Sequence, residues 1–255
     1  MKRIAFTLAG LFLGLALLAQ DAFLRKEFVF GADTLRYRLL LPENPEPGKQ
    51  YPLVLFLHGA GERGRDNEAQ LVHGSQMWLN PVNRETYPAF VLFPQCPEGE
   101  FWAYDGRPED LAPGAMPVDP PVSKQVRLLT TLLATYLDRP DVDRSRIYVM
   151  GLSMGGMCTF DLICRYPEVF AAAVPICGSV YPPRLASVHG VAVSIYHGDN
   201  DTTVPTEASR QAYRFLKSIG ADVRYKEFVG CTHGSWNPAF NEPDFMSWLF
   251  SQKKH

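Results

Sequence analysis

The sequence has no excess of charge of either sign, since 25 lysines and arginines face 27 aspartates and glutamates and the formal net charge is −2. A chain that binds nucleic acid concentrates basic residues to neutralise phosphates, and no such excess is present. The bias of disordered or fibrous chains is also absent, because 46% of the residues are hydrophobic and 12% are aromatic. The composition therefore excludes nucleic acid as the expected partner and predicts a globular protein with a sizeable core.

Cysteine and histidine are few and scattered. The five cysteines include no C-x-x-C pair, and the six histidines show no spacing typical of a zinc site. The odd number of cysteines leaves at least one free thiol even in a compartment that allows disulfides. We therefore expect no metal site.

Only one long apolar run is present, and it lies at the N-terminus. Lys2 and Arg3 precede an apolar segment that continues to about Ala19. A positive start and an apolar stretch shorter than the roughly 20 residues of a membrane span are typical of a secretory signal peptide. An uncleaved anchor is the alternative. We expect residues 1–20 to be removed, leaving a secreted or periplasmic protein with no membrane span.

Strand and helix patterns alternate along the rest of the chain. Residues 25–41 alternate in hydrophobicity around a Gly31-Ala32-Asp33 turn, which predicts an antiparallel hairpin. Continuous apolar runs favour strands buried on both faces, and apolar residues at helical spacing predict the helices between them. The expected strands are 51–57, 89–93, 146–150, 170–176, 191–196 and 223–229, and the expected helices are 67–79, 122–137, 154–165, 206–219 and 238–251.

This order of elements predicts one α/β domain over residues 21–255. Its sheet is expected to be mostly parallel, with the N-terminal antiparallel hairpin at one side and helices on both faces.

A Gly-Leu-Ser-Met-Gly segment at residues 151–155 follows a predicted strand and precedes a predicted helix. In a strand–turn–helix context, G-x-S-x-G places the serine on a strained turn that exposes its hydroxyl, and the glycines let strand and helix approach closely. The start of the helix offers N–H groups to a developing oxyanion. Ser153 is therefore the predicted nucleophile, and an idle serine in a glycine-rich turn is the alternative.

A nucleophilic serine needs a base, and the base needs a carboxylate that orients it. In folds of this type both follow the serine in the chain. One later strand runs into His197-Gly-Asp199-Asn-Asp201, and the next ends shortly before His233. Because the carboxyl ends of parallel strands meet at one edge of the sheet, both loops should reach Ser153. His233 is the predicted base and Asp201 the predicted acid, with Asp199 as the alternative acid and a structural role for His197.

The loop after strand 51–57 reads His-Gly-Ala-Gly-Glu-Arg-Gly. Small residues at this position let a backbone N–H approach the substrate oxygen. We expect the amides of Ala60 and Met154 to form the oxyanion hole, with Gly61 as the alternative to Ala60. Four polar residues lie in or just after this loop, namely Glu62, Arg63, Asp66 and Asn67. We expect them to hold the loop in place, and substrate binding is the alternative role.

The loop over residues 94–121 leaves the end of a strand, so it should form one wall of the site. It carries Gln95 and Trp102, and Trp236 closely follows the predicted base. Aromatic faces in a cleft suit sugar rings or phenolic acids, and packing within the loops is the alternative role for both tryptophans. The predicted substrate-binding residues are Gly61, Gln95, Trp102 and Trp236.

Taken together, these segments resemble a known superfamily. Five segments are similar to segments of α/β-hydrolases, namely HGAGERGRDN, PQCP followed by a tryptophan, GLSMGG, HGDNDTTVP and THGSWNPAF. Within that superfamily the chain resembles secreted esterases of the dienelactone-hydrolase and polyhydroxybutyrate-depolymerase type, whose relatives include feruloyl and acetyl-xylan esterases, phospholipase/carboxylesterases and "predicted peptidases". The resemblance implies a Ser153–Asp201–His233 triad and no cofactor. Many relatives carry a helical cap where this chain has only residues 178–190, which implies an open site.

The resemblance implies a serine carboxylic ester hydrolase that acts through an acyl-enzyme. The expected partners are small-molecule or glycan-linked esters with acyl or phenolic acid groups. A lysophospholipase or thioesterase-like lipid hydrolase and a serine peptidase are the alternatives. A non-catalytic binding protein of this fold is disfavoured because all three triad residues are present. Thiol chemistry at Cys231 is not expected, since a shared turn need not aim its sulfur at His233.

Overall fold

The computed structural model describes residues 22–254. Residues 1–20, the predicted signal peptide, lie outside the described residues. Within residues 22–254, no helix combines the length and the apolar character that crossing a membrane requires.

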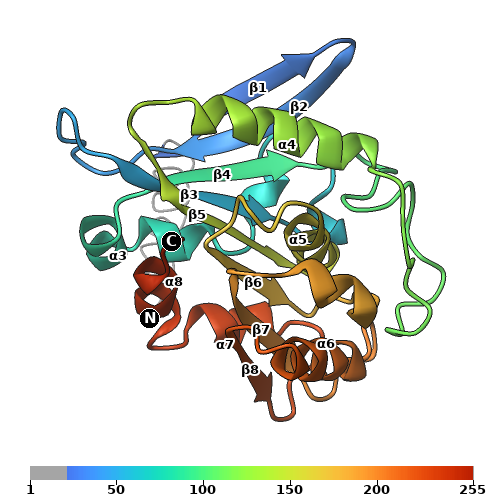
Figure 1. Cartoon of the computed structure of the whole chain (residues 1–255). Coiled ribbons are helices and arrows are strands. Elements are labelled where there is room, and N and C mark those ends of the chain that lie inside the picture. The colour runs from blue at the N-terminus through green and yellow to red at the C-terminus, as the bar shows by residue number, and fades with distance from the viewer. Residues whose placement is uncertain (1–21, 255) are drawn as a thin grey trace, which may run out of the picture.

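One eight-stranded sheet runs through the molecule in the order β1-β2-β4-β3-β5-β6-β7-β8 (Figure 1). β1 and β2 form an antiparallel hairpin, β2 pairs antiparallel with β4, and all other pairs are parallel. This arrangement confirms the predicted α/β fold. The strands are β1 Leu24–Phe30, β2 Asp33–Leu40, β3 Tyr51–Leu57, β4 Phe90–Gln95, β5 Val142–Leu152, β6 Ala172–Ile176, β7 Ala192–Gly198 and β8 Val223–Phe228.

Helices cover both faces of the sheet because parallel neighbours need crossover connections. The α-helices are α2 Ser75–Leu79, α3 Pro81–Thr86, α4 Lys124–Leu137, α5 Met154–Arg165, α6 Thr206–Ser218, α7 Trp236–Phe240 and α8 Phe245–Ser251. Three short 3₁₀ helices are η1 Ala60–Glu62, η2 Ala69–Leu71 and η3 Pro182–Ser187.

Two hydrophobic cores lie on the opposite faces of the sheet. Successive side chains of a strand point to opposite faces, so Leu53 and Leu55 of β3 enter one core while Val54 and Phe56 enter the other. The first core contains apolar residues of α4, α5 and α6, and the second contains those of α2, α7 and α8. β3 and β6 are therefore apolar along their whole length and β5 is apolar from Ile147 onward, as the continuous runs in the sequence predict.

Two of the predicted helices are interrupted. The helix expected over 67–79 is replaced by η2 and α2, with Gly74 between them at φ +80°. A Cβ at Gly74 would lie 2.4 Å from the ring of Phe56, so this backbone turn needs glycine. The helix expected over 238–251 is divided into α7 and α8 around Pro243, which cannot continue a helix because it lacks an N–H.

The C-terminal end of the described chain is held at the edge of the sheet where β5 begins. The backbone N–H of Lys254 donates to the carbonyl of Ser145 at 2.8 Å, and the Tyr148 hydroxyl donates to the carbonyl of Gln252 at 2.8 Å. This edge is opposite the one at which β5 ends and runs into Ser153.

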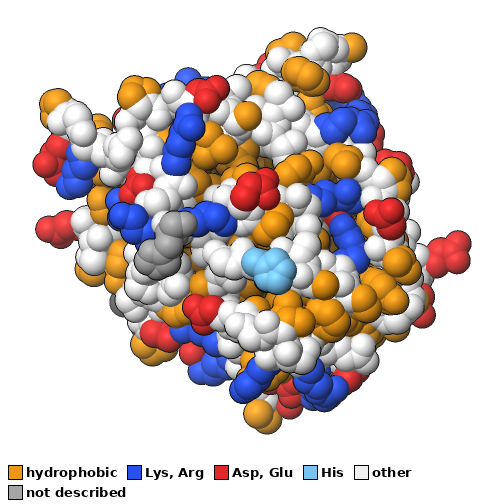
Figure 2. All heavy atoms as spheres, viewed as in Figure 1, with side chains coloured by type: hydrophobic (Ala, Val, Ile, Leu, Met, Phe, Trp, Pro, Cys, Tyr) orange, Lys and Arg blue, Asp and Glu red, His pale blue; other side chains and the backbone are white. Residues whose placement is uncertain are grey.

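Charged side chains are mixed over the surface. On the face shown in Figure 2, lysines and arginines alternate with aspartates and glutamates, and no area of a single sign dominates the view.

Candidate active site

Ser153 lies at a sharp turn between β5 and α5, with φ +53° and ψ −113°. A positive φ is strained for a residue with a side chain, and the turn projects the hydroxyl away from the sheet. The turn is so tight that a Cβ at Gly155 would lie 2.0 Å from the carbonyl oxygen of Leu57. Glycine at position 155 therefore allows α5 to begin directly against β3.

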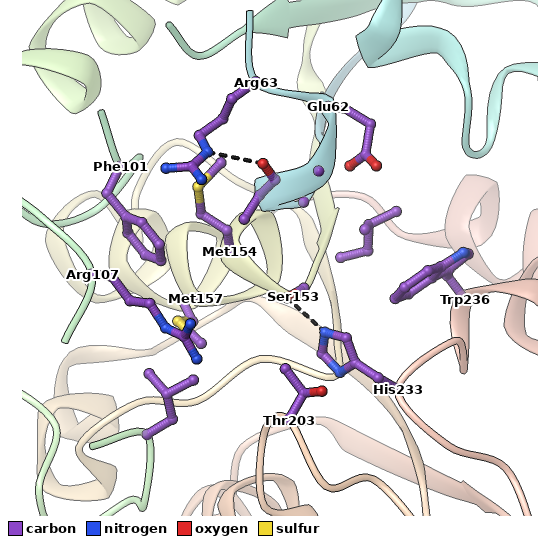
Figure 3. A pocket seen from close by; sticks show the side chains of 15 residues that line it. Glu62, Arg63, Phe101, Arg107, Ser153, Met154, Met157, Thr203, His233 and Trp236 are labelled. Carbon is purple, nitrogen blue, oxygen red and sulfur yellow. Dashed lines mark hydrogen bonds between the residues drawn. The ribbon is translucent and has the colours of Figure 1, made fainter. Parts of the chain in front are cut away.

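The structure brings the predicted nucleophile, base and acid together at one edge of the sheet. His233 Nε2 lies 2.8 Å from Ser153 Oγ, as Figure 3 shows, and His233 Nδ1 lies 2.7 Å from Asp201 Oδ2. Asp201 follows β7 and His233 follows β8. With Nδ1–H donating to the carboxylate, Nε2 is free to accept the serine proton, which is the geometry that nucleophilic catalysis requires.

The Asp201 carboxylate is fully buried and receives four hydrogen bonds. Oδ1 accepts from the amides of Thr203 at 2.8 Å and Val204 at 3.0 Å, and Oδ2 accepts from His197 Nε2 at 3.1 Å in addition to His233. Burial alone would raise the pKa of Asp201, but the bonds from the two imidazoles and the two amides outweigh it and hold this pKa well below its usual range. The carboxylate therefore stays ionised and fixed in place.

The alternative acid, Asp199, lies elsewhere in the same loop. Its Oδ1 accepts from the amide of Gly230 at 2.6 Å, so this side chain joins the β7 loop to the turn after β8. His197 is fully buried and orients the acid, since its Nδ1 lies 2.7 Å from the Ser209 hydroxyl and its Nε2 faces Asp201. Of the two aspartates, Asp201 is the one that reaches the base.

The two predicted oxyanion donors both line the pocket beside Ser153. Ala60 opens η1 and Met154 opens α5, and the first N–H groups of a helix have no acceptor within the helix. Arg63 holds this loop, because its Nε donates to the Ala60 carbonyl at 2.8 Å and its Nη1 donates to the Glu100 carbonyl at 3.2 Å. Both residues therefore lie beside Ser153 at the start of a helix, a setting in which backbone amides are available to an oxyanion.

His58 supports the same loop from below. Its Nδ1 donates to the Gly59 carbonyl at 2.6 Å, and its Nε2 accepts from the Cys96 amide at 2.9 Å. Burial lowers the pKa of His58 to about 4, so the ring is neutral at physiological pH. This bond pattern joins the ends of β3 and β4 to the start of the oxyanion loop.

The pocket next to Ser153 has a volume of about 320 Å³ and is lined mainly by apolar side chains (Figure 3). Its lining residues are Gly59, Ala60, Gly61, Glu62, Arg63, Phe101, Arg107, Leu111, Leu152, Ser153, Met154, Met157, Thr203, His233 and Trp236.

Two of the predicted substrate-binding residues lie in this pocket. Gly61 forms part of the oxyanion loop, and Trp236 packs its ring edge-on against the His233 ring with 5.5 Å between centroids. Trp236 also contacts the His73 ring, with 5.1 Å between centroids. The tryptophan therefore forms the wall of the pocket on the side of the base.

The predictions for Gln95 and Trp102 are wrong. Trp102 is fully buried, and its Nε1 donates to the His58 carbonyl at 3.1 Å. Gln95 is also buried, with its Oε1 accepting from the Asn67 amide at 2.7 Å and its Nε2 donating to Asp66 at 2.7 Å. Both side chains hold the loops together beneath the pocket and do not line it.

Loop 94–121 does form a wall of the site, as predicted, but through residues that the sequence did not single out. Phe101, Arg107 and Leu111 are its contributions to the pocket, and α5 adds Met157. No residue pattern distinguishes these side chains from their neighbours, because the path of an irregular loop decides which of them face the serine. The helical position of Met157, one turn after the nucleophile, is the one signal that could have identified it.

One group of side chains within residues 22–254 has the donor types for a metal, namely Cys177, Asp201 and His233, whose potential ligand atoms lie within 4.8 Å of one another. Burial raises the pKa of the Cys177 thiol to about 12, which keeps it protonated, although a metal needs the thiolate. The carboxylate and the imidazole already bond each other. This donor set therefore fits a hydrogen-bonded triad better than a metal site.

Comparison with known proteins gives a consistent result. A family model described as phospholipase/carboxylesterase matches residues 44–243. The solved structure of a thermostable esterase superposes with a TM-score of 0.84 at 36% identity, covering 93% of this chain and 64% of that chain.

Two curated relatives are similar at lower identity. Carboxylesterase SOBER1 of Arabidopsis thaliana is 24% identical over 199 residues, covering 72% of this chain and 84% of that protein. Feruloyl esterase B of Thermothelomyces thermophilus is 26% identical over 178 residues, covering 67% of this chain and 53% of that protein. The chain thus spans only part of the length of the feruloyl esterase and of the thermostable esterase.

Proposed function

This chain belongs to the phospholipase/carboxylesterase family, and from that premise we propose that Ser153, His233 and Asp201 catalyse the hydrolysis of small carboxylic esters. The observation that carries the proposal is the continuous chain of hydrogen bonds from Ser153 Oγ through His233 to the buried Asp201, at 2.8 and 2.7 Å. The chain is a carboxylesterase-type hydrolase, and this geometry supports the roles that we propose for the three residues.

In the first half-reaction, Ser153 Oγ attacks the ester carbonyl while His233 Nε2 takes its proton. The amides of Ala60 and Met154 bind the oxyanion, and His233 then gives the proton to the leaving alcohol. Asp201 keeps the imidazole in the reactive tautomer and stabilises its charged form. In the second half-reaction, His233 activates a water molecule that releases the acid from the serine and restores the enzyme.

The size and lining of the pocket favour short acyl or monoaromatic acid groups. Its 320 Å³ is about twice the volume of a 150 Å³ cavity that accommodates benzene, and it lies at the lower end of the range of small-molecule sites. Phe101, Leu111 and Met157 give it an apolar surface that suits a phenolic acid. The similarity to a relative named feruloyl esterase B also supports an aromatic acid group in the substrate.

The alcohol part of the substrate meets little obstruction. Residues 178–190 form only the short helix η3, Pro182–Ser187, and build no helical cap. An uncapped site accepts a bulky alcohol, so we include carbohydrate-linked esters in the proposed substrate class.

The test is hydrolysis of 4-nitrophenyl acetate, butyrate, octanoate and ferulate by the wild type, Ser153→Ala and Ser218→Ala. Ser218 is exposed on α6, which makes it a matched control. We expect turnover of the short and aromatic esters to fall at least about 10³-fold in Ser153→Ala and to be unchanged in Ser218→Ala. Stronger turnover of octanoate would favour a lipid substrate over the proposed class.

A fluorophosphonate probe separates a narrow specificity from a missing activity. The wild type should be labelled at Ser153 and the Ser153→Ala variant should not. A folded wild type that neither reacts with the probe nor hydrolyses any of the esters would refute the proposal and favour a non-catalytic binding protein.

A further inference from the structure

Two arginines line the pocket, and Arg107 differs from Arg63 because Arg63 is bonded to the Ala60 and Glu100 carbonyls whereas Arg107 is not used in this way. Arg107 stands in the loop after β4 and lines the same pocket as Ser153, and in Figure 3 its guanidinium extends from below Phe101 toward Met157. Apart from Arg63, whose guanidinium holds the oxyanion loop, the lining residues on this side are the apolar Phe101, Leu111, Met154 and Met157. A cation at this place affects which acyl groups the pocket accepts.

The guanidinium of Arg107 is not used within the protein. Among the arginines of residues 22–254, only Arg65 and Arg107 have no hydrogen-bond or ion-pair partner, and Arg65 does not line the pocket. The nearby carboxylate of Asp110 is occupied in its own turn, where it accepts from the Ala112 amide at 2.8 Å. Arg107 is also exposed. All the N–H donors of its guanidinium are therefore available to a ligand.

The one acidic residue that lines the pocket lies on the other side of the serine. Glu62 faces His73, with 3.5 Å between Oε1 and Nε2, and in Figure 3 it lies toward Trp236. The pocket is thus divided into a Trp236 side that carries the acid and a Phe101 side that carries the free cation.

The chemistry of the triad assigns these two sides to the two parts of an ester. His233 must protonate the leaving oxygen, so the alcohol leaves on the side of His233 and Trp236. The acyl group then extends the other way, along Phe101 and Met157 toward Arg107. A negative charge that reaches Arg107 therefore belongs to the acid part of the substrate.

We infer that Arg107 binds a carboxylate at the far end of the acyl group, so that esters of dicarboxylic acids, with one acid group free, are preferred substrates. Guanidinium and carboxylate match in shape and form two parallel hydrogen bonds. The apolar walls between Ser153 and Arg107 receive the carbon chain that separates the two acid groups. This inference rests on the proposed esterase function and names the substrate class of the same site.

The test uses two esters that differ only in charge. One is the 4-nitrophenyl monoester of adipic acid with a free terminal carboxylate, and the other carries a terminal carboxamide instead. We expect the wild type to favour the carboxylate ester and Arg107→Met to lower its kcat/KM about tenfold, while kcat/KM for the carboxamide ester stays within about twofold. Arg107→Glu should reverse the preference.

Arg65→Met is the matched control, because it removes the same charge outside the pocket. It should leave both kcat/KM values unchanged. Raising the salt concentration from about 0.05 to about 1 M should reduce the preference of the wild type and leave Arg107→Met unaffected, since an exposed ion pair is screened.

An unchanged ratio of the two kcat/KM values in Arg107→Met, or an equal loss for both esters, would overturn the inference. Failure of the proposed function has a different signature, because the wild type would then hydrolyse neither the carboxylate nor the carboxamide ester. Hydrolysis of the carboxamide ester by Arg107→Met also shows that the variant is folded.

Discussion

His58 couples the pH of the medium to the stability of the oxyanion loop. Its ring is fully buried, accepts from Cys96 and donates to Gly59, and has a pKa of about 4 against an ordinary value of 6.5. The unfolded chain therefore binds a proton below pH 6.5 that the folded chain takes up only near pH 4. The stability that this residue contributes is present above pH 6.5 and decreases as the pH falls toward 4.

We predict that proton binding to His58 in the unfolded chain lowers the free energy of unfolding by up to about 3 kcal/mol as the pH falls from 6.5 to 4. Urea unfolding at several pH values would measure this for the wild type, His58→Gln and His189→Gln. His58→Gln should lose less free energy over this interval than the wild type. The exposed His189 serves as the control, and its replacement should leave the pH dependence as in the wild type. Parallel curves for all three proteins would contradict the prediction.

The site residues that could be predicted from the sequence are those whose positions are set by the topology of the sheet, not by the path of a loop. Ser153, Asp201 and His233 each follow the carboxyl end of a parallel strand, so topology alone brings them together. The roles of Gln95 and Trp102 depend on the path of an irregular loop, which the sequence pattern does not specify. A tryptophan or glutamine in such a loop is as suitable for holding the loop as for binding substrate, and here the buried hydrogen bonds decide for the first role.

The turn between β5 and α5 contains the described glycine with the least room for a side chain, Gly155. A Cβ at Gly155 would lie 2.0 Å from the Leu57 oxygen and 2.5 Å from the Leu57 carbonyl carbon. Both are backbone atoms of the central strand β3, so neither can move aside without displacing the sheet.

We predict that Gly155→Ala lowers the free energy of unfolding by at least about 3 kcal/mol and prevents the triad from forming. Gly61→Ala is the control, because a Cβ there meets nothing within 4 Å although the residue lines the same pocket. That variant should unfold within about 0.5 kcal/mol of the wild type. Thermal unfolding of both variants is the measurement. A Gly155→Ala variant as stable as the wild type would show that the backbone of β3 can shift to make room for the methyl group.

Long elements with regular patterns were predictable, and short ones beside turns were not. The helix expected over 154–165 is present with the same bounds because its apolar period extends over three turns. The helix expected over 238–251 continued an apolar pattern through Pro243, where the chain in fact separates α7 from α8. Backbone chemistry at single prolines and glycines overrides the side-chain period at such places.

At the scale of the whole molecule, a buried ion-pair network fastens the end of loop 94–121 to helix α5 and to η3. Asp161 of α5 is fully buried and accepts from Arg165 Nε at 2.7 Å and Arg184 Nη2 at 2.5 Å. Arg165 also donates to the Pro120 carbonyl at 2.7 Å. Asp161 thereby connects α5, η3 and the end of the loop that carries Phe101 and Arg107.

We predict that Asp161→Asn destabilises the protein by about 3–5 kcal/mol, because two arginines lose their buried counter-charge. Asp138→Asn is the control, since this exposed aspartate pairs with Arg144 at the surface and its loss should cost less than about 1 kcal/mol. Chemical unfolding measures both effects. Hydrogen exchange should also become faster in residues 96–121 of Asp161→Asn, and unchanged exchange there would argue against fastening by this network.

The class of the whole fold followed from the order of strand and helix patterns, but the order of strands in the sheet did not. The chain doubles back so that β4 lies between β2 and β3, and β5 pairs with the other side of β3. Long-range pairing of this kind depends on crossovers and on which faces the helices cover, and neither is encoded in a local pattern.

The position of Lys254 has a practical consequence for attaching the protein to a surface. Lys254 bonds Ser145 near the start of β5, and Ser153 follows eight residues later beyond the end of the same strand, roughly 25 Å away. A resin or electrode coupled through this end of the chain would face the opposite edge of the sheet. The immobilised molecules would then present their pockets to the flowing liquid, in one orientation and without a long spacer.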